Sequence, residues 1–216
     1  MRLLPAISRN SLLLGIFAAA TTLVIGAIYS ATKDDIALAE RIAEEKQLLE
    51  IIPSEKHDNS MLDDHFTVDR EAPLLALRQS RRGYIARDGD RIIGVILPAT
   101  ARDGYSGDIR LLVGIYVDGT VAGVRVVTHR ETPGLGDAID LKKSDWILDF
   151  SGRSLGDPPA EQWRVKKDGG MFDQFTGATV TPRAVVNATR RALDYAEQNR
   201  ARLFTADDAI TPGEAT

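Results

Sequence analysis

The sequence predicts an α+β protein: one N-terminal transmembrane helix, then a periplasmic domain whose largely antiparallel, twisted sheet is flanked by helices. Three observations support this fold class. The stretch 10–32 holds 23 residues and no charge, and a helix needs ~20 apolar residues to cross a bilayer. Asp-Gly turn signals at 88–90 and 118–119 each separate two segments rich in Ile and Val, as in β-hairpins. After residue 182, apolar residues recur at helical spacing.

Composition and charge exclude several classes of function. The 216 residues include no cysteine, which excludes disulfides, thiol catalysis and cysteine-ligated iron–sulfur clusters on this chain. The net charge is −4, and because Arg2 and Arg9 are the only charges before residue 33, residues 33–216 carry −6. Nucleic-acid-binding proteins favour a basic face, so we expect no nucleic-acid partner.

The charges beside the apolar stretch predict its orientation. Arg2 and Arg9 precede it and acidic residues follow it, so the positive-inside rule places 1–9 in the cytoplasm and everything after Lys33 outside it. The alternative is a cleaved signal peptide, for which 18–20 (Ala-Ala-Ala) could imitate a cleavage site. The apolar core before that site is shorter than the ~7–15 residues expected, and the apolar run continues unbroken to Tyr29. We therefore favour an uncleaved anchor at 10–32.

Residues 33–75 predict an amphipathic helix followed by a linker. Apolar and charged residues alternate at helical spacing from Ile36 to Ile52, and Pro53 is expected to end the helix. The following stretch, 53–72, predicts an irregular segment with a short helical turn. His57 and His65 match no metal-ligand spacing, so solvated loop histidines are expected rather than a metal site.

Two hairpins and three further elements are expected in the domain, 76–205. The hairpin strands are 84–87 with 91–97, and 108–117 with 120–128. Residues 138–150 predict a helix that buries Ile139, Trp146, Ile147 and Phe150, followed by a Gly/Pro-rich connector at 152–161. A short strand at 162–167 and a turn at 168–170 come next, then a helix from about 182 to 203. Residues 206–216 predict a flexible tail.

The stretch before the last helix suits an anion. Thr181 is a natural N-cap and Pro182 fits the first helical position. Gly177 and Ala178 let the backbone approach a ligand closely, and free N–H groups at a helix N-terminus attract phosphate. On this local pattern alone, a capped helix after a tight turn is the commoner explanation.

Three segments together resemble one family. Asp173-x-x-Thr176-Gly177-Ala178-Thr179 resembles the flavinylation motif of FMN-binding domains, in which FMN is joined through its phosphate to the last hydroxyl residue, here Thr179. The segments 104–107 (Gly-Tyr-Ser-Gly) and 129–136 (His-Arg-Glu-Thr-Pro-Gly-Leu-Gly) fit the same family. With the anchor, the chain resembles G subunits of the Rnf (Rsx) electron transport complex. The C subunit of the sodium-pumping NADH:quinone oxidoreductase is related.

The resemblance implies an FMN-binding domain at 76–205 and a set of cofactor-binding residues. They are Thr179 as the covalent phosphoester attachment, with Thr176, Gly177, Ala178, Glu131, Thr132, Leu135, Gly136, Ser106 and Gly107 around it. Leu135 would supply an apolar surface to the flavin, while Glu131 and Thr132 could bond to its polar edges. Lys166 or Lys167 could neutralise a phosphate oxygen. No catalytic residue and no metal are expected.

The same resemblance implies the function and partners. The chain would be a bacterial inner-membrane flavoprotein that relays electrons within an ion-translocating ferredoxin/NADH complex. Its partners would be the other membrane and iron–sulfur subunits, and a flavin transferase would attach the FMN. Two alternatives remain open: a cofactor-free, membrane-tethered assembly module, and a stand-alone flavin reductase with non-covalent FMN.

Overall fold

The structure, a computed structural model, describes residues 3–205, with their side chains from residue 11 on. The predicted tail, 206–216, and the first two residues therefore lie outside the described part. The chain divides into two compact units between Glu44 and Glu45.

The first unit consists of a long helix. This helix, α1, spans Leu3–Leu49 and is continuous through the predicted span and the predicted amphipathic segment. From Ser11 on, it is long and apolar enough to cross a membrane, and an 18-residue stretch of it has a mean hydropathy of 2.2. Its large apolar side chains between Leu12 and Tyr29 are exposed, which suits a lipid-facing surface. The helix ends before Pro53, three residues earlier than the sequence predicts.

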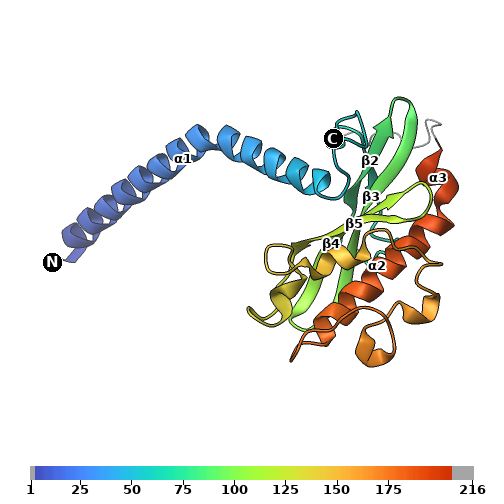
Figure 1. Ribbon diagram of the computed structural model, residues 1–216. Helices are drawn as coiled ribbons and strands as arrows, with labels where there is room; N and C mark the ends of the chain where they lie inside the picture. Colours follow the sequence, from blue (N-terminus) through green and yellow to red (C-terminus); the bar gives the residue numbers. More distant parts are fainter. Residues whose placement is uncertain (1–2, 206–216) are drawn as a thin grey trace. The chain divides into compact units, whose positions relative to one another are not determined.

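The second unit is built on an antiparallel sheet, as predicted, and the sheet has five strands. The strands are β1 (His65–Val68), β2 (Arg81–Asp88), β3 (Arg91–Gly104), β4 (Gly107–Tyr116) and β5 (Val121–Thr128), paired in sequence order (Figure 1). Both predicted hairpins are confirmed, β2 with β3 and β4 with β5. A third hairpin, not predicted, joins β3 to β4, and its tip contains Tyr105 and Ser106. The strand β1 is also a difference, since 53–72 is expected to be irregular.

The main core lies between one face of the sheet and the C-terminal helices. Helix α2 (Val180–Gln198) packs on β3 and β4, and the short α3 (Arg200–Phe204) follows it (Figure 1). Val185, Ala188 and Ala192 of α2 are fully buried. The predicted helix 182–203 is thus confirmed, although it begins two residues earlier and is interrupted at Asn199.

A second, smaller core covers the other face of the sheet, where Leu48 and the two residues Ile51 and Ile52 are buried. A Cβ at Gly114 of β4 would overlap the side chain of Ile51, so the glycine makes room for it. Arg125 of β5 donates to the carbonyl of Glu50 at 2.7 Å and to its carboxylate at 3.2 Å. The segment that follows α1 is therefore fixed to the sheet.

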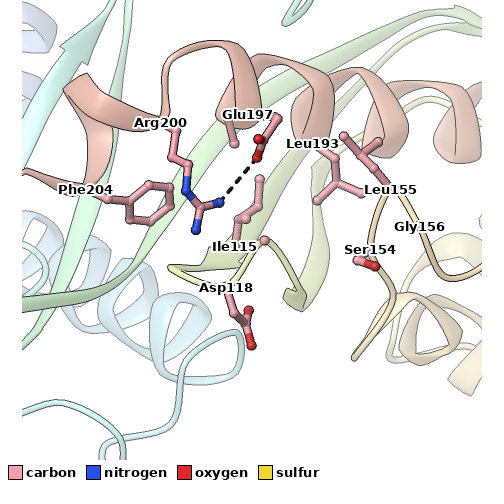
Figure 2. Close-up of a pocket in the computed structure, with 11 residues that line it drawn as sticks. Ile115, Asp118, Ser154, Leu155, Gly156, Leu193, Glu197, Arg200 and Phe204 are labelled. Carbon is pink, nitrogen blue, oxygen red and sulfur yellow. Dashed lines mark hydrogen bonds and ion pairs between the residues drawn. The ribbon is translucent and has the colours of Figure 1, made fainter.

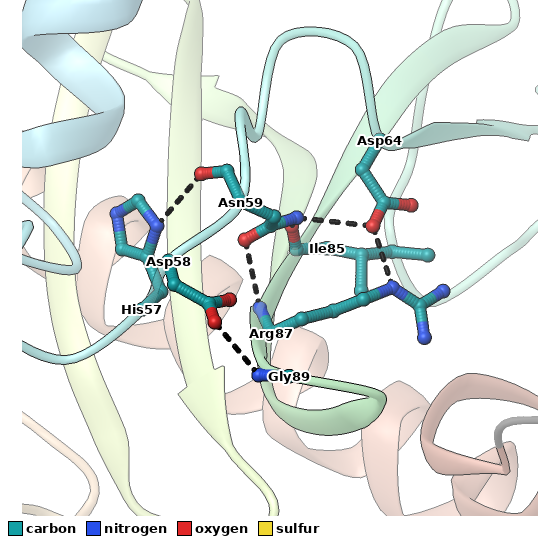
Figure 3. Close-up of polar contacts among 7 residues, drawn as sticks. All are labelled: His57, Asp58, Asn59, Asp64, Ile85, Arg87 and Gly89. Carbon is teal, nitrogen blue, oxygen red and sulfur yellow. Dashed lines mark hydrogen bonds and ion pairs between the residues drawn. The ribbon is translucent and has the colours of Figure 1, made fainter.

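The segment from 53 to 64 is held to β2 by side chains (Figure 3). The amide of Asn59 donates to the Ile85 carbonyl (2.9 Å) and to Asp64 (3.0 Å), and its oxygen accepts from the backbone N–H of Arg87 (2.8 Å). The prediction of solvated loop histidines is wrong for both residues. His57 is half-buried, with Nδ1 2.9 Å from the Asn59 carbonyl, and His65 is half-buried in β1, with Nδ1 3.1 Å from the Leu62 carbonyl.

Residues 136–150 form two separate 3₁₀ helices instead of the predicted α-helix. They are η1 (Gly136–Ile139) and η2 (Asp145–Phe150). The break comes from Ser144, whose hydroxyl accepts from the N–H of Trp146 (3.1 Å) and starts η2 afresh. All four apolar residues predicted to be buried are buried, Ile139 in η1 and the other three in η2.

The predicted strand 162–167 is absent from the described residues. Two 3₁₀ turns overlap the ends of this stretch, η3 (Ala160–Gln162) and η4 (Lys166–Asp168), and a single bridge joins Val165 to Phe172. Three aromatic rings hold the loop: Phe150 stacks on Phe172 with ring centroids 4.6 Å apart, and Trp163 lies 5.3 Å from Phe172. Backbone hydrogen bonds act together with this packing: the N–H of Lys166 donates to the Phe172 carbonyl (2.7 Å), and the N–H of Phe172 donates to the Arg164 carbonyl (3.2 Å).

Candidate functional site

A buried carboxylate joins the three segments that the sequence singles out. Glu131, in the loop after β5, is 3% exposed. Its carboxylate accepts from the backbone N–H groups of Ser106 (2.8 Å) and Tyr105 (3.3 Å), at the tip of the β3–β4 hairpin. It also accepts a short hydrogen bond from the hydroxyl of Thr181, in the first turn of α2. The hairpin tip, the 131–136 loop and the start of α2 therefore meet at Glu131.

These donors make the burial of Glu131 tolerable, since a buried acceptor without partners destabilises a fold. The backbone N–H of Glu131 in turn donates to the ring Nδ1 of His129 (3.1 Å), which gives that histidine a structural role. A Cβ at Gly136 would come within 3.0 Å of both the Glu131 Cβ and the Thr181 hydroxyl. Only glycine lets these two side chains approach so closely at that position.

The 131–136 loop holds Leu135 outward. The carbonyl of Thr132 accepts from the N–H groups of Leu135 (3.1 Å) and Gly136 (3.0 Å), and Asp137 accepts from Gly134 (2.7 Å). The loop is therefore closed by its own backbone bonds, and the Leu135 side chain remains 46% exposed. An apolar side chain held at the surface in this way suits contact with a planar ligand.

The turn before α2 lies against that leucine. The N–H of Ala178 donates to the carbonyl of Phe175 (3.1 Å), and Gly177 takes a φ of 81°, a conformation that L side chains rarely adopt. A Cβ at Gly177 would lie 3.6 Å from Leu135 Cδ2, so the turn and the leucine are neighbours. Trp146 fastens the turn by donating to the carbonyl of Asp173 (2.9 Å).

The three threonines of the motif have different environments. Thr181 is fully buried and bonded to Glu131, whereas Thr176 is exposed. Thr179 is half-buried, and within residues 11–205 its hydroxyl has no hydrogen-bond partner. The prediction that Thr181 is the N-cap is wrong: Thr179 occupies that position, and Pro182 is the third helical residue. The Thr181 hydroxyl is taken by Glu131 instead of by the helix backbone.

The structure thus separates the predicted site residues into two groups. Thr132, Leu135, Thr176 and Gly177 are exposed, as are Ser106 and Gly107 at the hairpin tip, and Ala178 and Thr179 are half-buried. Glu131 and Gly136 are buried beneath them and bind the segments to one another. Two exposed residues beside the motifs are absent from the predicted set, Tyr105 (71% exposed) and Val180 (39%). Both adjoin predicted site residues in the sequence, which is the signal that could have indicated them.

Charged residues beside the motif form ion pairs. Lys166 lies 2.6 Å from the carboxylate of Asp173, the first residue of the motif. Arg183 donates to Asp168 through Nε (2.6 Å) and Nη2 (2.9 Å). Hydrogen bonding from Arg183 holds the pKa of Asp168 below its usual value. These pairs line the side of the motif that faces the 164–168 loop.

A cavity of about 330 Å³ lies elsewhere, at the C-terminal end of α2 (Figure 2). Leu193 and Ile115 form part of its apolar lining, and Arg200, which is paired with Glu197 at 3.3 Å, lies beside Phe204. None of the predicted site residues lines this cavity. The convergence at Glu131 therefore remains the candidate functional site.

Comparison with known proteins identifies the family of the chain. Residues 104–194 match the model of the FMN-binding domain, a range that includes all three motif segments, and residues 1–51 match the RnfG N-terminal region. The chain is 51% identical to the G subunit of the ion-translocating oxidoreductase complex of Pseudomonas aeruginosa strain UCBPP-PA14, over 93% of this chain and 94% of that protein. It is 45% identical to the corresponding G subunit of Escherichia coli strain K12 (93% and 96%) and 44% identical to that of Vibrio atlanticus (94% and 96%). The chain belongs to the family of G subunits of the Rnf ion-translocating oxidoreductase complex, and it carries the FMN-binding domain of that family.

Proposed function

We propose that this chain is a membrane-anchored electron-transfer subunit that carries FMN in a phosphoester bond to Thr179. The observation that supports this most directly is the meeting of three distant segments at Glu131, which brings Leu135 and the turn 175–178 together beside Thr179. The unengaged hydroxyl of Thr179 suits esterification, whereas that of Thr181 is buried and occupied.

The exposed residues suit a flavin in two ways. Leu135 offers an apolar surface, and Gly177 beside it has no side chain that would keep a planar ring away. Thr132, Thr176, Ala178, Ser106 and Gly107 would line the remaining edges, with Gly136 and Glu131 supporting them from below. FMN supplies one- and two-electron redox chemistry when bound, and the protein contributes attachment, orientation and tuning of the potential.

The proposal includes the location and the partners. α1 would cross the bacterial inner membrane with residues 1–9 in the cytoplasm, and the domain would lie in the periplasm, because the arginines precede the span. The other subunits of the complex, including iron–sulfur subunits, would exchange electrons with the flavin. A separate flavin transferase would attach the FMN to the chain.

Two alternative functions make different predictions. A cofactor-free assembly module would show no flavin absorption. A reductase with loosely held FMN would release the FMN in denaturant.

The test is in-gel flavin fluorescence under denaturing conditions, combined with the mass of the intact chain. The wild-type protein, exported together with a flavin transferase, is expected to gain one FMN. Thr179→Val should abolish the fluorescent band, while Thr176→Val and Thr181→Val should retain it. A band that persists in Thr179→Val would refute the attachment site. Covalent flavin on a chain kept in a compartment without the transferase would refute the maturation scheme.

A further inference from the structure

The structure offers a cation for the attached phosphate other than the two lysines indicated by the sequence. Arg183 lies four residues after Thr179, and its backbone N–H donates to the Thr179 carbonyl at 3.3 Å, so one helical turn connects the two residues. Side chains four residues apart lie on the same helix face. Helical side chains also tend to lean toward the N-terminus of their helix, and Thr179 precedes the first residue of this one.

The guanidinium of Arg183 is fixed by Asp168 and keeps further N–H donors that bind no protein acceptor among the described residues. Asp168 accepts from Nε and Nη2 of the guanidinium, at 2.6 and 2.9 Å. Arginine carries further N–H donors, including both on Nη1, and among the described residues no protein acceptor binds the Nη1 donors of Arg183. A hollow of about 300 Å³, lined by Arg164, Asp168, Arg183 and Asn187, adjoins the guanidinium. A fixed guanidinium beside open space suits an incoming anion.

The lysines are placed differently. Lys166 forms an ion pair with Asp173 at 2.6 Å, as Arg183 does with Asp168, but an ammonium group lacks the planar fork that fixes the remaining donors of an arginine. The backbone N–H of Lys167 donates to the side chain of Gln174 at 3.1 Å, but within residues 11–205 no ion pair fixes its ammonium group. Ordering a free lysine side chain on a phosphate loses rotamer entropy, whereas Arg183 is already ordered by Asp168.

We propose that Arg183, oriented by Asp168, donates a hydrogen bond to the phosphodiester that links FMN to Thr179. This inference rests on the proposed function, since it requires the covalent attachment. Asp168 already balances the charge of the guanidinium, so the contact with the phosphodiester is a hydrogen bond from Nη1 and not a neutralisation of charge. Asp168 remains bonded to the opposite edge of the guanidinium. The contact makes Arg183 a cofactor-binding residue that anchors the phosphate end of the flavin.

The test uses the flavinylated full-length protein in detergent, with nitrogen-15 in its arginine side chains. Dipolar coupling between phosphorus-31 and nitrogen-15, measured by solid-state NMR, is expected in the wild-type protein and lost in Arg183→Gln. The phosphorus resonance should also move in Arg183→Gln and remain at its wild-type position in Lys167→Gln, the matched control. The wild-type coupling shows that an arginine binds the phosphate, and its loss in Arg183→Gln distinguishes Arg183 from Arg164, which lines the same hollow.

The outcomes separate this inference from the proposed function. A protein-bound phosphorus signal without coupling to arginine nitrogen would overturn the role of Arg183 and leave the attachment intact. A resonance that moves in Lys167→Gln and not in Arg183→Gln would assign the contact to the lysine instead. The absence of any covalently bound phosphorus in the wild-type protein would overturn both proposals.

Discussion

Thr181→Val tests whether the hydroxyl of Thr181 supports the fold through Glu131. Valine keeps the shape of threonine and removes the donor. The side chain is fully buried, so the carboxylate of Glu131 would lose one of its three donors with no access to water. Hydrogen bonds to charged groups contribute about 1.5–3 kcal/mol. We therefore expect the free energy of unfolding to fall by about 2 kcal/mol, or the melting temperature by about 4–8 °C for a domain of this size.

The assay is urea denaturation of the full-length protein, followed by tryptophan fluorescence. The chain has two tryptophans, Trp146 and Trp163, and both are buried in the second unit, so the signal reports on that unit. Thr189→Val is the matched control: Thr189 is equally buried on the same helix, but its hydroxyl donates to the Val185 carbonyl one turn back. Because that carbonyl also belongs to the helix ladder, we expect a smaller loss, below about 1 kcal/mol.

A double-mutant cycle decides between the Glu131 contact and ordinary helix capping. If Thr181 acts through Glu131, Thr181→Val and Glu131→Gln should couple by about 0.5–3 kcal/mol, as contacting residues do. If Thr181 merely capped the helix, the two losses would add independently. Additive losses in the cycle would refute the bridging role of Glu131.

Three further predictions follow from other contacts. Ile51→Ala should lower the free energy of unfolding by about 2–5 kcal/mol, because Ile51 is buried against the sheet. Ile42 is exposed, so Ile42→Ala should change the free energy of unfolding little. Equal losses in the two variants would contradict this. Leu135→Asp should lower the flavin's reduction potential by placing a negative charge beside it, with covalent attachment retained, and an unchanged potential and spectrum would exclude Leu135 from the site. Hydrogen bonding from the side chain and then the backbone of Thr120 lowers the pKa of Asp118 below 3.8. The ionised carboxylate of Asp118 therefore stabilises the fold above pH 3.8, and this stabilisation is lost as the pH falls through the lowered pKa. In Thr120→Ala, the pKa of Asp118 measured by NMR titration should rise, and the loss of stability on acidification should become smaller.

Short-range sequence signals predict the parts of the fold that short-range forces determine. The Asp-Gly turns and the flanking strands are identified correctly because hairpin residues are neighbours in the chain. The strand β1 is missed because His65–Val68 offers only four residues of pattern and is specified by its pairing with β2. The helix predicted at 138–150 is wrong in type but right in its buried face, since apolar spacing does not distinguish 3₁₀ from α-helix over so few residues.

In the candidate site, too, local sequence signals predict some features, and contacts between distant residues determine the others. The resemblance predicts a set of site residues, but it does not show which of them lie at the surface. Glu131 and Leu135 belong to one loop, yet the first is buried and the second exposed. The proline after Thr181 indicates an N-cap, whereas the Thr181 hydroxyl bonds to a residue 50 positions earlier. No local pattern encodes a contact at that separation, so only the folded chain reveals it.

The position of Glu131 also has a consequence for the order of biogenesis. Its partners lie 25 residues before it, at Ser106, and 50 residues after it, at Thr181. Contacts between such distant residues form only once the intervening chain has been ordered, which makes them late events in folding. An unfolded chain would contain Thr179 but no surface on which a flavin ring could rest. A flavin attached before folding would therefore remain in water, and the quenching of its fluorescence would mark the moment at which the hairpin, the loop and α2 come together.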